Sequence, residues 1–198
     1  MLAWPYVLTK GEKMILTLII LAVVVLYVIS VYNGLVVARQ RVKEAWSTID
    51  TQLKRRYDLI PNLLETVKGY AKHEKQTLQA VIEARNLAMK TTSTAKKGRA
   101  EENLSSTLKS IFALGESYPD LKANTNFLEL QRELADTEDK IQATRQFYNT
   151  VVLTLNTKIE MFPSNIFANL FHFQKAPFFE MSEAEAKVAK KAPTVKFD

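Results

Sequence analysis

The sequence predicts an all-α protein, with an N-terminal transmembrane helix followed by an antiparallel helical bundle of three to four long helices. Three observations lead to this expectation. Residues 14–31 form an uncharged apolar run, apolar residues further along recur at helical spacing, and the 198 residues include only 5 glycines and 6 prolines. A β-sandwich or a Rossmann domain of this length needs more turn glycines, so long helices with few turns are favoured.

The apolar run at residues 14–31 has the length of a membrane span. Its 18 residues rise about 27 Å as a helix, close to the roughly 30 Å of a hydrocarbon core. Tyr27 and Tyr32 lie toward one end, where aromatic side chains favour the membrane interface. A cleaved signal peptide is the alternative, but its apolar region is shorter, about 7–15 residues, and it ends at small residues. We therefore expect residues 14–37 to remain as a transmembrane helix.

Basic residues on the two flanks predict the orientation of this helix. Lys10 and Lys13 precede it, whereas Arg39, Arg41, Lys43 and the run 54–56 follow it. The more basic flank usually stays in the cytoplasm, so the N-terminus is expected outside and the bulk of the chain inside. Arg39, Arg41 and Lys43 are also candidates for contact with lipid headgroups, because the net charge is +6 and anionic membranes attract basic segments.

These observations divide the chain into five parts. In order, we expect a short extracytoplasmic segment at 1–13, a transmembrane helix at 14–37, a cytoplasmic helical bundle at 38–162, an aromatic C-terminal segment at 163–181, and a disordered tail at 182–198.

Helical spacing organises the predicted bundle. An apolar stripe begins at Val42 and meets Pro61, where either a kink or a chain reversal is possible, and the absence of a nearby glycine favours a kink. The stripe then continues to Ile82, and the polar residues 91–98 are expected to form a loop. A last long helix is predicted over 127–161, with Asn126 as its N-cap.

The sequence offers no residues for known catalytic chemistry. It has no cysteine and only two histidines, and His73-Glu74 lacks the second histidine that a zincin motif requires four residues later. No glycine-rich phosphate loop, serine nucleophile motif or nucleic-acid module is recognisable. We therefore assign no catalytic residue, metal or cofactor, and expect no nucleic-acid partner.

Polar residues beside the apolar stripes are candidates for a structural network that fixes helix register. Arg145 lies close to the stripe of the last helix, and a buried arginine must be paired, so we expect it to contact Asp58, Asp120 or Asp50. A ligand or partner site built on the same residues is the alternative. The candidates are Asp50, Arg55, Arg56, Asp58, Asn62, Asp120, Arg145, Asn149 and Asn156.

Aromatic residues near the C-terminus are candidates for contact with a protein partner, because exposed apolar patches mark interaction sites. Packing against the chain's own helices is equally compatible with the sequence. The candidates are Phe167, Phe171, Phe173, Phe178 and Phe179.

Several sequence blocks resemble the LemA family of bacterial membrane proteins. They are YNGLV at 32–36, AWSTID at 45–50, QLKRRYDLIPNL at 52–63, YPDLKA at 118–123 and FYN at 147–149, followed by FPSN at 162–165. The resemblance implies a single-pass protein of the bacterial inner membrane with a cytoplasmic helical bundle and no enzyme activity. It also implies a scaffold or adaptor linked to membrane-protein quality control, and one branch of the family is linked to magnetosome membranes.

We therefore expect a non-catalytic, membrane-anchored scaffold or adaptor. Its expected partners are membrane lipids and an unidentified protein, for which a membrane protease system is one candidate, and a homo-oligomer is also possible. The alternative is a self-assembling protein that shapes membranes or organises lipids.

Overall fold

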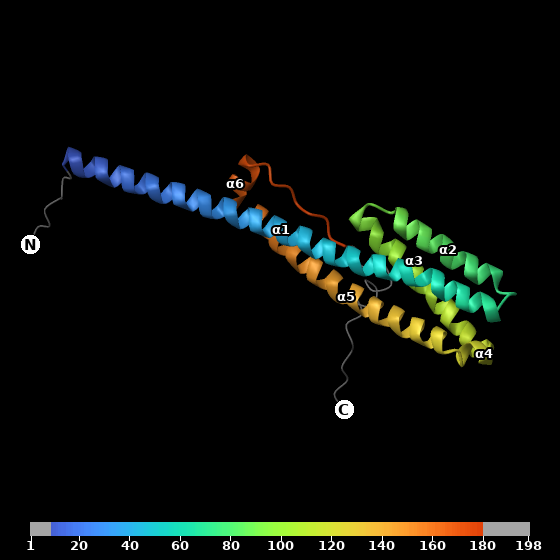
Figure 1. The fold of residues 1–198 in the computed structure, drawn as a ribbon. Coiled ribbons are helices and arrows are strands. Elements are labelled where there is room, and N and C mark those ends of the chain that lie inside the picture. The colour runs from blue at the N-terminus through green and yellow to red at the C-terminus, as the bar shows by residue number, and fades with distance from the viewer. Residues whose placement is uncertain (1–8, 180–198) are drawn as a thin grey trace, which may run out of the picture. The chain divides into compact units, whose positions relative to one another are not determined.

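A computed structural model describes residues 9–179 and contains helices and no strands in that range (Figure 1). The six helices are α1 (Lys10–Tyr70), α2 (Lys75–Lys90), α3 (Thr94–Ser117), α4 (Pro119–Lys122), α5 (Thr125–Glu160) and α6 (Ser164–Leu170). The predicted tail at 182–198 and most of the predicted outer segment at 1–13 lie outside the described residues. The chain divides into two compact units, the first with residues 1–41 and 153–175 and the second with residues 42–152 and 176–198.

The N-terminal part of α1 contains the predicted membrane span. Every residue from Met14 to Tyr27 is exposed, and Leu18, Ile20 and Leu26 each expose more than half of their surface. Within the described residues, α1 is the one helix long and apolar enough to cross a membrane, by length and composition. An unburied helix this apolar needs an apolar environment in place of water.

The first unit has a small apolar core of its own. Its buried residues come from α1, α5 and α6, and they are Leu35, Ala38, Leu155, Ile159 and Ala168. Helix α6 ends in a Schellman motif, in which the Phe173 N–H donates to the Ala168 carbonyl and the His172 N–H donates to the Asn169 carbonyl. His172 takes the left-handed conformation that this motif requires, with φ at 56°.

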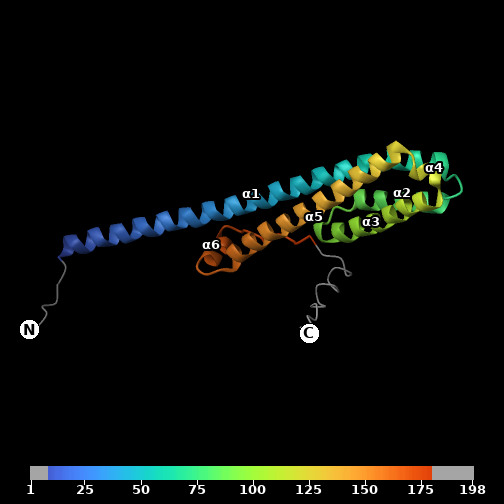
Figure 2. The ribbon, with the colours of Figure 1, turned by 90° about the horizontal axis from the view of Figure 1, so that it is seen from below.

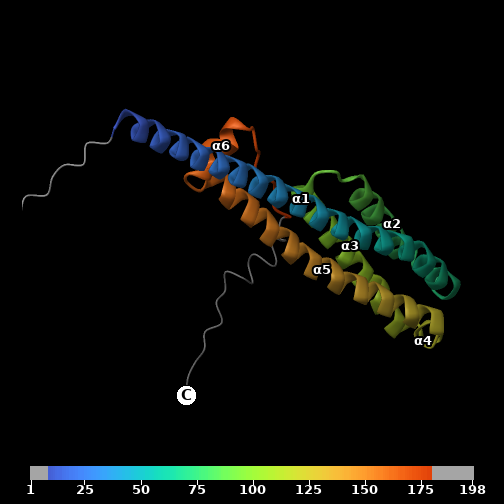
Figure 3. The ribbon, with the colours of Figure 1, turned by 60° about the vertical axis from the view of Figure 1, so that its left-hand side comes forward.

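The second unit is built on two long apolar stripes. On α5 the buried residues recur every seven positions, at Phe127, Leu134, Ile141 and Tyr148, which is the repeat of helices that pack lengthwise. The α1 and α5 segments of this unit run antiparallel, because Trp46 contacts Tyr148 while Arg55, further along α1, pairs with the earlier Glu133. Helices α2 and α3 lie side by side in all three views (Figures 1, 2 and 3).

Pro61 lies inside α1 and does not reverse the chain. Proline has no N–H, so the carbonyl of Tyr57, four residues earlier, loses its helical donor. Arg85 of α2 replaces that donor, since its Nε lies 2.8 Å from the Tyr57 carbonyl oxygen. The helix therefore continues through the proline because a neighbouring helix satisfies the backbone group that the proline leaves open.

The predicted helix boundaries were wrong at three places. The stripe expected to run to Ile82 breaks at residues 71–74, which contain no glycine or proline, although Gly69 lies in the last turn of α1. Contacts from elsewhere hold that turn, since the Tyr118 hydroxyl donates to Glu74 at 3.0 Å and Asn124 donates to the Tyr70 hydroxyl at 2.9 Å. Tertiary hydrogen bonds of this kind leave no local pattern in the sequence.

The other two boundary errors have local causes. The predicted loop at 91–98 shortens to residues 91–93, because Lys97 lies on α3 and donates to the Ala88 carbonyl at 2.8 Å, near the end of α2. The N-cap of α5 is Asn124, whose Oδ1 accepts from the Phe127 N–H at 3.0 Å. Both Asn124 and Asn126 could cap, and the apolar spacing alone did not separate them.

The Arg85 contact predicts that the stability lost when Arg85 is replaced depends on whether Pro61 is present. Arg85→Met should lower the free energy of unfolding by about 1–3 kcal/mol, because it strands the partly buried Tyr57 carbonyl. Pro61→Ala supplies the missing N–H, so Arg85→Met should cost less in that background, by roughly 1 kcal/mol. Urea denaturation of the full chain in detergent, followed by circular dichroism, measures all four proteins. Equal costs in both backgrounds would contradict this account.

Candidate functional site

Arg56 lies at a core position of α1. The buried positions of this stretch include Ile49, Leu53, Arg56, Ile60 and Leu63, a spacing of three and four that one face of a helix produces. Arg56 is 2% exposed, whereas arginine is almost never so buried unless it is paired. The candidate site is therefore a cation placed where the helix would otherwise carry an apolar side chain.

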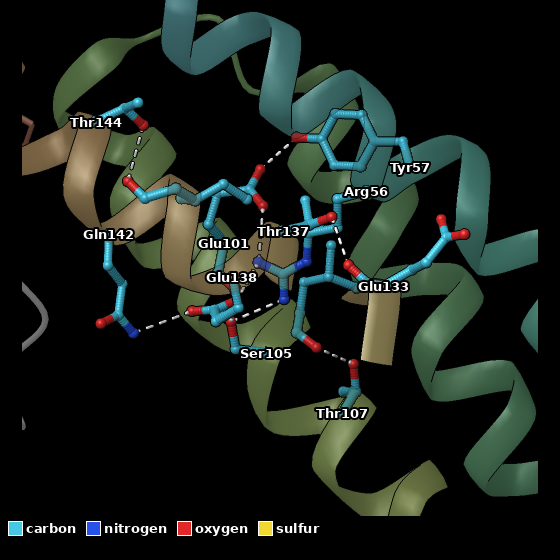
Figure 4. A network of polar contacts seen from close by, with 12 residues as sticks. Arg56, Tyr57, Glu101, Ser105, Thr107, Glu133, Thr137, Glu138, Gln142 and Thr144 are labelled. Carbon is cyan, nitrogen blue, oxygen red and sulfur yellow. Dashed lines mark hydrogen bonds and ion pairs between the residues drawn. The ribbon is translucent and has the colours of Figure 1, made fainter. Parts of the chain in front are cut away.

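Side chains from α3 and α5 surround the Arg56 guanidinium (Figure 4). Its Nη1 lies 2.8 Å from Glu138 Oε2 and 3.7 Å from Glu101 Oε2, and its Nη2 donates to Ser105 Oγ at 2.8 Å. Ser105 in turn lies 3.0 Å from Glu138 Oε2, to which its hydroxyl donates. One cation of α1 is thus paired with a carboxylate from each of two other helices.

Glu101 is the buried anion of this cluster and accepts a short hydrogen bond from the Tyr57 hydroxyl. Burial raises the pKa of the Glu101 carboxyl, while Tyr57, Arg56 and Lys97 each oppose that rise. Burial, followed by the neighbouring Glu101 charge, also raises the pKa of the Tyr57 hydroxyl. The ammonium of Lys97 lies 5.5 Å from the centre of the Tyr57 ring, adding a cation–π contact.

A hollow of about 260 Å³ opens beside this cluster. Three basic residues line it, Arg56, Lys109 and Arg145, and three acidic residues oppose them, Glu101, Glu102 and Glu138. This balance gives the hollow no single sign of charge with which to select an anion or a cation. Its remaining lining residues are Gly98, Ser105, Ile141, Gln142 and Phe179.

The cluster lacks the elements of a known catalytic centre. Ser105 is the serine of the cluster, but the carboxylate that accepts its hydrogen bond is already paired with Arg56, and both histidines are exposed. No group of acidic or histidine residues within 9–179 could hold a metal ion. The arrangement pairs Arg56 with two carboxylates and joins three helices, and it leaves Glu101 Oε2 buried without a hydrogen-bond partner.

The structure brings together only part of the predicted polar network. Arg55 is exposed and pairs with Glu133 at 3.5 Å and Asp136 at 3.8 Å. Arg145, the arginine expected to be buried, is half-buried at the hollow, and the arginine that lies in the core is Arg56. The pairing of Arg145 with an aspartate stays a prediction. The predicted residues with exposed side chains are Asp50, Asp58, Asn62 and Asp120, and Asn156 is half-buried in the first unit.

The sequence analysis missed Glu101, Ser105 and Glu138. One signal could have found the site, since Arg56 continues the three-and-four spacing between Leu53 and Ile60 and was therefore due to face the core. Its partners lie 45 or more residues away on other helices, and no spacing rule connects them to it.

Asn149, another predicted network residue, binds the backbone near the C-terminus. Its Oδ1 accepts from the Phe179 N–H at 2.9 Å, and its Nδ2 donates to the Phe179 carbonyl at 3.1 Å. The Tyr148 hydroxyl donates to the Pro177 carbonyl at 2.9 Å, and Trp46 packs on the Phe179 ring. Phe179 is 2% exposed, so its prediction as a partner contact was wrong, because it completes the core of its own unit.

The other aromatic candidates divide between exposed and packed. Phe178 is exposed. Phe167 packs edge-on against Tyr27, and both Phe171 and Phe173 pack against Tyr32, so these three contact the chain's own α1 within the first unit. Arg39, a predicted headgroup contact, lies over the Phe173 ring at 5.2 Å. The other two, Arg41 and Lys43, are exposed.

Comparison with known proteins finds one matching family and three similar proteins. The model of the LemA family matches residues 45–197. Protein LemA of Metamycoplasma hominis is 29% identical over 157 residues, which cover 77% of this chain and 70% of the relative. Magnetosome proteins MamQ 1 and MamQ 2 of Paramagnetospirillum magneticum are each 27% identical over 85 residues, covering 43% of this chain and 31% of theirs.

Replacing Arg56 should lower the free energy of unfolding far more than replacing its neighbour Arg55. Arg56→Met leaves Glu101 and Glu138 without their buried cation, which should lower the free energy of unfolding by about 3–5 kcal/mol. Arg55→Met removes only exposed ion pairs and should cost less than about 1 kcal/mol. Chemical denaturation of the full chain in detergent compares them. Similar costs for both would reject a buried ion-pair cluster.

The raised pKa of Glu101 predicts a pH-dependent stability. The folded protein holds this proton more tightly than the unfolded chain, so this group's stabilising effect is present below its ordinary pKa of 4.5 and is lost as the pH rises through the raised value. Glu101→Gln stays neutral and should gain stability relative to the natural chain as the pH rises from 4.5 toward neutrality.

Glu102→Gln is the matched control for Glu101→Gln, since Glu102 lines the same hollow with an exposed side chain. Its free energy of unfolding relative to the natural chain should stay level over the same pH range. Denaturation curves at several pH values measure both differences. If the stability difference between Glu101→Gln and the natural chain does not change with pH, burial does not raise the pKa of Glu101.

Proposed function

Because this chain belongs to the LemA family, we propose that it is a non-catalytic scaffold or adaptor, anchored in the bacterial inner membrane by residues 14–37. The exposed apolar surface of α1 between Met14 and Tyr27 carries the anchoring proposal. Such a surface is stable in hydrocarbon and costly in water. The N-terminus lies outside and the antiparallel helical bundle at 38–162 lies in the cytoplasm, on the side of Arg39, Arg41 and Lys43.

The polar cluster around Arg56 supports a scaffold role over a catalytic one. Its charges are matched within the protein, at 2.8 Å between Arg56 and Glu138, and its carboxylates are engaged by Arg56, Tyr57 and Ser105. Groups held in this way stabilise a rigid helical surface and are poorly placed to bind and release a reactant. A rigid surface displayed next to a membrane is suited to holding a partner, for which a membrane protease system is one candidate.

Crosslinking in native membranes tests the scaffold proposal. A photoreactive residue at an exposed position of α2, such as Gln76 or Glu83, should capture a defined protein that mass spectrometry identifies. The same residue at Leu21, within the proposed span, is the control for contacts that reflect only membrane crowding. If the α2 positions capture neither a partner protein nor a second copy of this chain, the scaffold proposal is wrong.

A second candidate function is self-assembly that shapes the membrane or organises its lipids. The similarity of 85 residues to two magnetosome proteins favours it, and the exposed Arg41 and Lys43 could bind anionic headgroups, each contributing about 1 kcal/mol. This function requires large homo-oligomers, whereas an adaptor does not.

Sedimentation of the purified full chain in detergent separates the two candidates. The adaptor is expected as a small species of constant size, and a self-assembling protein as large species that grow with concentration. Arg41→Gln with Lys43→Gln should weaken assembly on vesicles containing phosphatidylglycerol if headgroup contacts drive it. Unchanged assembly would exclude this basic pair as the cause.

A further inference from the structure

Helix α6 and the residues just before it carry an unusual concentration of exposed apolar side chains. Phe162 exposes 76% of its surface and Leu170 exposes 64%, with Met161 and Ile166 each at 54%. Phe171, directly after the helix, exposes 41%. We call these five residues the α6 patch. Five exposed apolar side chains within eleven residues would, in water, mark a contact that the isolated chain leaves open.

The position of α6 on α1 indicates what covers this patch. Within the first unit, Phe167 of α6 packs edge-on against Tyr27, with ring centres 6.1 Å apart, and Phe171 packs against Tyr32 at 5.0 Å. Tyr27 lies inside the uncharged run that ends at Val31, and Tyr32 follows it directly. Helix α6 is therefore attached to the last turn of the uncharged run 14–31 and to the residue directly after it.

Depth along α1 places the patch at the boundary between acyl chains and headgroups. Taking the end of the uncharged run, Val31, as the edge of the hydrocarbon core, Tyr27 precedes that edge by four residues, about 6 Å of helix, so side chains at its level lie about that far inside it. Amphipathic segments that lie on a membrane bury their apolar faces about 5–10 Å into this boundary. The apolar surface of α6 thus continues the apolar surface of α1 at a depth where lipid is the surrounding medium.

The charges of this part of the first unit fit the same environment. Residues 27–41 and 153–175 contain four basic residues and one acidic residue. Lys158 donates to the Gly34 carbonyl at 3.4 Å, and Arg39 lies over the Phe173 ring, so both hold their charges just after the uncharged run 14–31 of α1. The acidic residue, Glu160, is paired with Lys175. Anionic headgroups favour such a basic rim around an apolar face.

We propose that α6 is a second membrane contact, in which Met161, Phe162, Ile166, Leu170 and Phe171 insert into the leaflet at which α1 leaves the bilayer. This inference rests on the proposed membrane anchor. The contact fixes α1 relative to the membrane surface at two points, because Phe167 and Phe171 join α6 to α1 through aromatic pairs. The lipid bilayer is the single occupant of the patch.

Site-directed spin labelling tests the proposal on the full chain in vesicles of phosphatidylcholine with one-third phosphatidylglycerol. The chain has no cysteine, so one introduced cysteine is a unique labelling site. Labels at Ile166→Cys and Leu170→Cys replace exposed side chains and leave the core intact. Collision with oxygen, which concentrates in lipid, should exceed collision with a water-soluble nickel chelate. Leu21→Cys is the lipid reference and Gln76→Cys, exposed on α2, is the aqueous reference.

The outcomes separate this proposal from the anchor proposal. Oxygen-favoured labels at 21, 166 and 170, with a nickel-favoured label at 76, support both. An oxygen-favoured label at 21 with nickel-favoured labels at 166 and 170 keeps the anchor and overturns the α6 contact. A nickel-favoured label at 21 overturns the anchor itself and the α6 contact with it. Labels at 166 and 170 that are closed to both reagents would mean that protein covers the patch, which also overturns the proposal.

A second variant checks that the labels report on insertion. With the label moved to Phe162→Cys, the pair Ile166→Asp and Leu170→Asp places two carboxylates on the patch, which disfavour hydrocarbon. The label at 162 should shift several-fold toward the nickel chelate while the helix content measured by circular dichroism stays constant. An unchanged ratio at 162 would count against the proposal.

Discussion

The buried guanidinium of Arg56 is the constraint on which the second unit depends. Placing a cation in an apolar core is unfavourable unless carboxylates and hydrogen bonds meet it, and here Glu101 and Ser105 from α3 and Glu138 from α5 do so. An apolar residue at position 56 would be compatible with several registers of the three helices, since leucine packs against any apolar neighbour. Arg56 is compatible with one register only, because sliding α5 by a single heptad would carry Glu138 about 10 Å away. Buried polar residues in helical seams are known to select register in this way, often without adding net stability.

Pro61 acts with this cluster to make one stretch of α1 specific. The carbonyl that the proline leaves open belongs to Tyr57, and the Tyr57 hydroxyl donates to Glu101. Tyr57 therefore binds α2 through its backbone and α3 through its side chain, directly beside Arg56. The block of residues 52–63 that resembles the LemA family is thus the block that binds the other helices through polar groups. Its residues are special because backbone and charge must both be satisfied there.

The sequence predicted what depends on local pattern. The all-helical class, the apolar part of α1 and the length of the last helix follow from hydropathy and spacing, and the observed α5 differs from the predicted 127–161 by a residue or two at each end. The break at residues 71–74 and the partners of Arg56 could not be predicted, because both depend on side chains that the fold brings from distant positions. The expectation that Arg145 is buried failed for a related reason. It lies near the apolar stripe, but a long side chain at the edge of a stripe can reach solvent, whereas Arg56 at the centre of its stripe cannot.

The aromatic C-terminal segment was expected either to contact a partner or to pack on the chain's own helices, and its residues divide among three separate tasks. Phe179 fills the core of the second unit, where Asn149 holds its backbone through two hydrogen bonds. Phe167 and Phe173 pack on α1 in the first unit, and the α6 patch remains exposed. Composition could not separate these tasks, because phenylalanine is suited to all of them. What separates them is the surroundings of each ring, which are tryptophan at 179, tyrosine at 167 and 173, and open surface at 162. A segment whose apolar residues are partly committed to its own fold has its remaining apolar surface at a fixed place. That fixed place, beside the end of the uncharged run of α1, makes a lipid leaflet a better match for the exposed apolar residues than a soluble protein.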